Sequence, residues 1–240
     1  MSFTLECTKI KRTGFVPAFV GGGLISAAVP VLDMIFRSEM YVGRDSSPVD
    51  ILLNANWQMM AMLNILLIVT GACIMYNAEY ADNAFQKICT LPTTESAVFF
   101  AKAVVMTVAG IMPLFIEAGA VFYCSAYWFG QYTGLYVEIL KHFAFLFLLM
   151  LPAVMVSLLI ASACKNMWIS LGIGVLCIFA ATMLPAQNFI LSLFPFALPF
   201  QTLSGKAVDV ISNYVAVCFA EIVVIDVLEV VFLKIRRLFE

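Results

Sequence analysis

Six long apolar stretches fill most of this 240-residue chain, at about residues 14–36, 55–76, 97–123, 141–163, 167–184 and 209–233. A helix of roughly 20 mostly apolar residues is long enough to cross the hydrocarbon core of a bilayer. Charged residues make up only 12% of the chain, too few to cover the surface of a soluble domain. The sequence therefore predicts an all-α membrane protein, with six transmembrane helices in a single domain over residues 1–240.

The distribution of Lys and Arg predicts the orientation, because cytosolic loops carry more of these residues than external loops. With a cytosolic N-terminus, nine of them lie on the inner side and four on the outer side. We therefore expect both termini in the cytosol and a multi-pass protein of the cytoplasmic membrane. No basic patch indicates nucleic-acid binding. The inner nine are Lys9, Lys11, Arg12, Lys87, Lys102, Lys165, Lys234, Arg236 and Arg237.

The N-terminal region has two features of its own. Residues 2–11 mix apolar and charged side chains, which is typical of a short amphipathic helix on the inner membrane surface. Within the first apolar stretch, Gly21, Gly22 and Gly23 remove side chains over one turn, which favours close helix packing, with local flexibility as the alternative. A cleaved signal peptide is disfavoured because the apolar length of about 23 residues exceeds the usual 7–15.

The region between the fifth and sixth stretches, residues 184–206, is apolar and aromatic but interrupted by prolines. Non-helical backbone survives at membrane depth only where protein or water satisfies its polar groups. We therefore expect a broken re-entrant or interfacial segment of short helices at the outer face. Its apolar side chains either meet lipid or an amphipathic peptide, or simply pack at the interface. The candidate residues are Pro185, Phe194, Pro195, Phe196, Pro199 and Phe200.

Four acidic residues fall inside the predicted spans: Glu117, Glu221, Asp226 and Glu229. A charge within a bilayer costs at least about 2.5–3.5 kcal/mol, so such residues usually face a cavity or a partner. They are either groups of a proton relay or neutral, hydrogen-bonded packing groups. No intramembrane Lys or Arg accompanies these acids, since Lys102 lies at the head of its stretch, and this favours packing.

Catalytic and metal-binding patterns are missing from the sequence. His142 is the only histidine, and the seven cysteines have no ligand or disulfide spacing. The sequence holds no GxSxG, no HExxH and no GxxxxGK[ST], so we expect neither an active site nor an ATP site of that kind. We predict a chain that is not an enzyme and binds no metal or cofactor of its own.

The predicted cytosolic loop, residues 77–102, opens with acidic residues and then carries a helix-compatible stretch that breaks at Leu91-Pro92. Thr93 or Thr94 can cap the helix that follows. A short helix with a proline elbow at the membrane surface is either a rigid element for a partner to bind or a plain connector. The candidate docking residues are Glu79, Phe85, Lys87, Ile88, Leu91, Pro92, Thr93 and Glu95.

The order of Glu79, Phe85-Gln86-Lys87, Leu91-Pro92-Thr93-Thr94 and Lys102 resembles the permease subunits of ABC type-2 exporters. Within that family the chain is most similar to the permeases of lantibiotic-immunity transporters, which share its length and six spans. Glu95 departs from the pattern, because the family often has a basic residue there.

The resemblance implies a permease with several partners. These are two copies of a separate ABC ATPase, which binds ATP and Mg, and a second permease, identical or homologous. The cargo is a lantibiotic-like peptide expelled from the bacterial membrane, which confers immunity and antibiotic resistance. The loop at 77–102 then couples to the ATPase, with Phe85, Ile88 and Leu91 as apolar anchors and Glu79 paired with a basic group on the partner or the N-terminal helix. A secondary transporter that uses the intramembrane acids and a membrane assembly factor are the alternatives.

Overall fold

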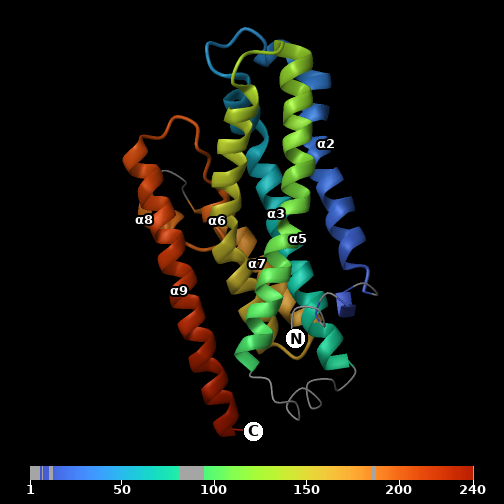
Figure 1. Ribbon diagram of the computed structural model, residues 1–240, viewed down its shortest axis with the longest axis vertical. Coiled ribbons are helices and arrows are strands. Elements are labelled where there is room, and N and C mark those ends of the chain that lie inside the picture. The colour runs from blue at the N-terminus through green and yellow to red at the C-terminus, as the bar shows by residue number, and fades with distance from the viewer. Residues whose placement is uncertain (1–5, 7, 11–12, 82–94, 185–187, 240) are drawn as a thin grey trace.

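The computed structural model describes residues 6, 8–10, 13–81, 95–184 and 188–239, and these are almost entirely helical (Figure 1). Residues 6 and 8–10 are helical and precede the first long helix. Within the described part of the chain there is no β-strand. The long helices are α2 (Phe15–Tyr41), α3 (Pro48–Ala81), α5 (Glu95–Cys124), α6 (Leu135–Ala163), α7 (Met167–Met183) and α9 (Val208–Phe239).

Each apolar stretch of the sequence lies in one of these helices. Four of the helices, α2, α3, α5 and α6, are long and apolar enough to cross a membrane by length and composition. The fifth, α7, is apolar but has only 17 residues, and α9 carries several acidic side chains along its length. The protein is therefore a multi-pass, helical membrane protein with at least these four candidate spans.

Helix α3 begins earlier than hydropathy alone predicts. The second apolar stretch was expected to start at residue 55, but α3 starts at Pro48. The hydroxyl of Ser47 accepts a hydrogen bond from the backbone N–H of Asp50 at 3.1 Å, which caps the first turn. Proline suits the first helical position because its missing N–H has no partner there in any helix. Polar residues thus extend the helix beyond its apolar section.

Helix α3 lies at the centre of the bundle, where it contacts α2, α5, α6 and α7, while α9 packs mainly on α6 (Figure 1). We call the end where α3 finishes and α5 begins the α3–α5 end. The opposite end, where α2 finishes and α3 begins, is the α2–α3 end. The core between the helices contains large buried side chains, among them Phe15, Phe19, Trp57 and Met60.

Two glycines of α2 lie where neighbouring helices approach closely. A Cβ atom on Gly23 would lie 2.8 Å from the Cα of Pro113 in α5, and one on Gly22 would lie 2.4 Å from a methyl group of Leu67. The expected packing role of the glycine triplet is therefore confirmed for these two positions. A Cβ on Gly21 would meet no atom within 4 Å.

The segment between α7 and α9 contains two short helical turns, α8 (Phe189–Ser192) and η2 (Leu198–Phe200). The indole N–H of Trp57 donates to the backbone carbonyl of Pro199 at 2.7 Å, which satisfies irregular backbone as expected. Phe196 is fully buried against α3, α6 and α7. The segment is thus folded into the bundle at the α2–α3 end.

This burial corrects part of the expectation for the segment. Phe196 and Pro199 are buried, so they belong to no exposed face, and Phe194, Pro195 and Phe200 are half-buried. The exposed apolar side chains lie on α8 instead, with Ile190 77% exposed. Pro185 lies outside the described residues.

Candidate functional site

Four charged side chains meet at the α3–α5 end, where α3 finishes and α5 begins. Glu79 lies in the last turn of α3 and Lys102 in the early part of α5, while Glu6 and Lys9 come from the N-terminal segment. The ammonium of Lys102 lies 2.7 Å from Glu6 and 2.8 Å from Glu79. The ammonium of Lys9 lies 2.7 Å from Glu6 and 3.1 Å from Glu79. We call these four residues the charge network.

The charge network is buried and electrically balanced. Lys102 is fully buried, Glu6 and Glu79 are almost so, and the Lys9 side chain remains 37% exposed. The ring of Tyr76 lies below Lys102, with 5.1 Å between the ammonium and the ring centroid. Two cations and two carboxylates each contact both opposite charges, so no charge of the network is left without a counter-ion.

The contacts of the charge network shift the pKa values of Glu6 and Lys9. Burial raises the pKa of Glu6, but the Lys102 and Lys9 ammonium groups outweigh it and the pKa is lowered overall. Burial lowers the pKa of Lys9, but hydrogen bonds and attraction from Glu6 and Glu79 raise it overall. Both groups therefore stay charged at neutral pH. Removing one partner from such a buried arrangement typically costs about 3–5 kcal/mol.

The network joins three segments far apart in sequence. It connects the N-terminal segment to α3 and α5, the two helices that flank residues 82–94. The expected pairing of Glu79 with a basic group of the N-terminal segment is observed, since Lys9 is that group. Sequence reasoning missed Glu6 as a partner, although the spacing of Glu6 and Lys9 matches a helical i, i+3 pair.

Most of the other predicted loop residues lie outside the described part of the chain. These are Phe85, Lys87, Ile88, Leu91, Pro92 and Thr93, and Glu95 is described only as the first residue of α5. Their assignment to ATPase coupling therefore remains a prediction. The structure adds the charge network between the two helices that flank residues 82–94.

The predicted intramembrane acids lie on two helices, Glu117 on α5 and the other three on α9. Glu117 on α5 is fully buried and accepts a hydrogen bond at 3.0 Å from the Asn64 amide of α3. On α9, Glu229 is buried, whereas Glu221 and Asp226 are half-buried, and Asp226 lines a hollow of about 310 Å³ between α5, α6 and α9. Among the described residues, Glu117 and the α9 acids form no joint cluster.

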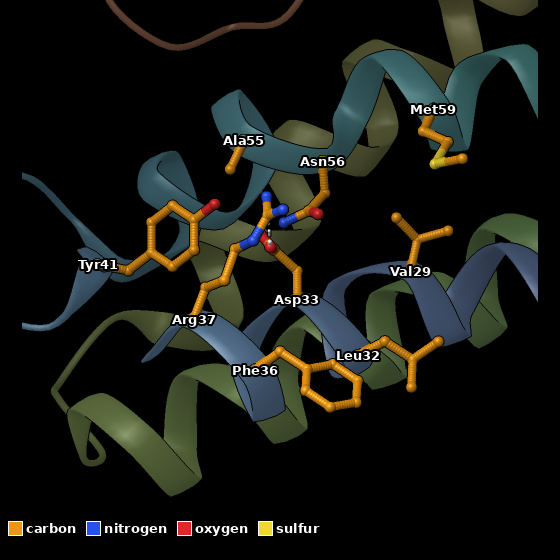
Figure 2. A pocket seen from close by; sticks show the side chains of 9 residues that line it. All are labelled: Val29, Leu32, Asp33, Phe36, Arg37, Tyr41, Ala55, Asn56 and Met59. Atoms are coloured by element: carbon orange, nitrogen blue, oxygen red, sulfur yellow. Dashed lines mark ion pairs between the residues drawn. The ribbon is translucent and has the colours of Figure 1, made fainter. Parts of the chain in front are cut away.

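A larger hollow of about 560 Å³ opens between α2 and α3 toward the α2–α3 end (Figure 2). Its wall is mainly apolar, with Leu32, Phe36 and Met59, while Asp33 and Arg37 form an ion pair at 3.9 Å on one side. The backbone of α2 departs from helical angles at Arg37. None of the residues singled out from the sequence lines this hollow.

The sequence matches one family of known proteins over most of its length. A family model described as "ABC-2 family transporter protein" matches residues 2–181, which is most of the chain and includes the entire charge network. Comparison with curated proteins and with solved structures gives no significant match.

Proposed function

The chain belongs to the ABC-2 family of transporter proteins, and from this premise we propose that it is the membrane-spanning permease subunit of an ATP-driven exporter. The family is a membrane transport component that works with an ABC ATPase. The sequence has no GxxxxGK[ST] motif, which supports hydrolysis by a separate subunit that binds ATP and Mg.

The charge network is the observation that supports docking of the ATPase at the α3–α5 end. In the proposed arrangement the α3–α5 end faces the cytosol, and the 82–94 loop contacts the ATPase. A loop transmits force only if its ends do not yield, and the Glu79–Lys102 ion pair at 2.8 Å connects the two helices that carry it. Lys9 and Glu6 extend this connection to the N-terminal segment.

The proposed complex contains two copies of the ATPase and a second permease, identical or homologous. All six long helices then serve as spans, with both termini in the cytosol, as the nine-to-four distribution of Lys and Arg supports. The proposed cargo is a cationic, lantibiotic-like peptide removed from the cytoplasmic membrane, which would give the cell immunity. This cargo follows from the similarity of the 79–102 motif to lantibiotic-immunity permeases.

The decisive test of the docking role uses the loop itself. Phe85→Ala removes a proposed apolar anchor that is not one of the four residues of the charge network, and Asn83→Ala, at a polar position outside the motif, is the matched control. We expect Phe85→Ala to insert normally but to lose co-purification of the ATPase and resistance to the peptide, because apolar side chains anchor a helix in a groove. Normal recruitment and resistance in Phe85→Ala would mean that the loop is only a connector.

Charge reversal at Glu79 would not test docking alone. A lysine there would face the ammonium groups of Lys9 and Lys102, which lie 3.1 and 2.8 Å from the Glu79 carboxylate. Repulsion within the network would then disturb folding as well as docking. Glu79→Gln, which only removes the charge, is the better companion to Phe85→Ala.

A further inference from the structure

Three side chains with metal-binding atoms converge at the α2–α3 end, opposite the charge network. Asp50 lies in the first turn of α3, and Glu138 and His142 lie one turn apart on α6. One ligand atom from each lies within 4.8 Å of the other two. The sequence predicts no metal site, because it holds no His or Cys pairs at ligand spacing. The Glu138-x-x-x-His142 spacing, which places both side chains on one helix face, was the available signal.

The imidazole of His142 is not satisfied by the protein. The side chain is only 6% exposed, its Nε2 lies 3.4 Å from Asp50 Oδ1, and its Nδ1 has no hydrogen-bond partner among the described residues. If the proton sits on Nε2, the buried Nδ1 lone pair is unused. If it sits on Nδ1, the lone pairs of Nε2 and Asp50 face each other. A cation bound between Nε2 and the carboxylates takes the Nε2 lone pair, with the proton on Nδ1, and so relieves the repulsion between Nε2 and Asp50.

The charge balance points the same way. Asp50 and Glu138 bring two carboxylates together, and in the described part of the chain neither forms an ion pair with a Lys or Arg. Two carboxylates that share a site repel each other unless a cation or a proton lies between them. A divalent ion would neutralise both.

The surroundings hold the carboxylates in place as outer-shell groups do in metal sites. The hydroxyl of Tyr132 donates to Glu138, and the hydroxyl of Ser204 donates to Asp50. Such hydrogen bonds fix the orientation of metal ligands and raise affinity. Ser204 belongs to the segment between η2 and α9, so the cluster joins that segment to the starts of α3 and α6.

We propose that Asp50, Glu138 and His142 bind one divalent first-row transition-metal ion, with water completing the coordination. One imidazole and two carboxylates suit Zn²⁺ and its neighbours better than Ca²⁺ or Mg²⁺, which prefer oxygen alone. Metal–ligand bonds of about 2.0–2.2 Å require the three side chains to close around the ion, and two of them lie on the same helix face. The bound ion would clamp the α2–α3 end of the bundle.

The test measures Zn²⁺ bound to the purified full-length chain, with its affinity tag removed, by equilibrium dialysis and metal analysis. We expect one saturable equivalent per chain, and at least tenfold weaker binding in His142→Ala, Asp50→Asn and Glu138→Gln. Asp45→Asn, an exposed acid in the α2–α3 connection, is the matched control and should bind like the wild type. No saturable site in the wild type would overturn the proposal.

Two further measurements test whether a variant has lost a metal ligand or has lost its fold, and whether cysteines bind the ion instead. Zn²⁺ should raise the melting temperature of the wild type and of Asp45→Asn but not of Asp50→Asn. Co²⁺ bound in place of Zn²⁺ should show no intense thiolate-to-cobalt absorption, since no cysteine is a ligand. Wild-type affinity in all three ligand variants, or strong thiolate absorption, would also contradict the proposal.

Discussion

Replacing Lys102 with methionine keeps the length and apolar stem of the side chain but removes the fully buried cation of the charge network. The carboxylates of Glu6 and Glu79 lose contacts of 2.7 and 2.8 Å and retain only the half-exposed Lys9. Breaking a buried pair typically costs about 3–5 kcal/mol of stability. Because Lys9 still pairs with both carboxylates, we expect a loss of about 3 kcal/mol. For a chain of this size that lowers the melting temperature by about 6–12 °C.

The assay is thermal unfolding of the purified chain in detergent, followed by tryptophan fluorescence. Lys165→Met, an exposed lysine between α6 and α7, is the control and should melt within about 2 °C of the wild type. Adding Glu79→Gln to Lys102→Met removes one charge of each sign and should recover about half of the loss, a coupling that a double-mutant cycle measures. A Lys102→Met protein that melts like the control would refute the network as a structural anchor.

Three further predictions follow from individual contacts. The pKa of Glu6 is lowered in the folded protein, so its stabilising effect is present at neutral pH and is lost as the pH falls below about 4. The melting temperatures of wild type and Glu6→Gln should therefore differ at pH 7 and converge in acid. A difference that stays constant with pH would contradict this. Glu117→Gln preserves an acceptor for Asn64 and should keep both stability and transport, whereas Glu117→Leu should lose about 1–3 kcal/mol; a well-folded Glu117→Gln without transport would favour a proton relay instead. Gly23→Ala forces a Cβ against the α5 backbone and should lose about 1–3 kcal/mol, while Gly21→Ala should be neutral, and equal melting of the two would rule out close packing there.

The helices and the end of the bundle that carries the loop were predictable from the sequence, because hydropathy is a local property. Every apolar stretch became a helix, and polar termini such as the Ser47–Asp50 turn shifted only the boundaries. The pairing of Glu79 with the N-terminal segment was also predictable, since an acid at a span end needs a counter-ion and Lys9 lies nearby in the topology.

The rest depends on contacts between distant segments, which local patterns do not specify. Nothing in the sequence around Phe196 distinguishes a side chain that meets lipid from one buried against α3, α6 and α7. The approach of Asp50 to His142 likewise arises only when α3 packs on α6. Long-range packing therefore decided both the burial of the external segment and the grouping of the metal-binding side chains.

Reconstitution in lipid vesicles shows whether this chain is the permease of an ATP-driven exporter. The chain and the ATPase that co-purifies with it are placed in lipid vesicles with a fluorescent cationic peptide in the membrane. We predict that ATP with Mg²⁺ removes the peptide from the bilayer, that Phe85→Ala uncouples this removal from the ATPase, and that Asn83→Ala does not. Peptide removal by the chain alone, without ATP or ATPase, would contradict its role as the permease of an ATP-driven exporter.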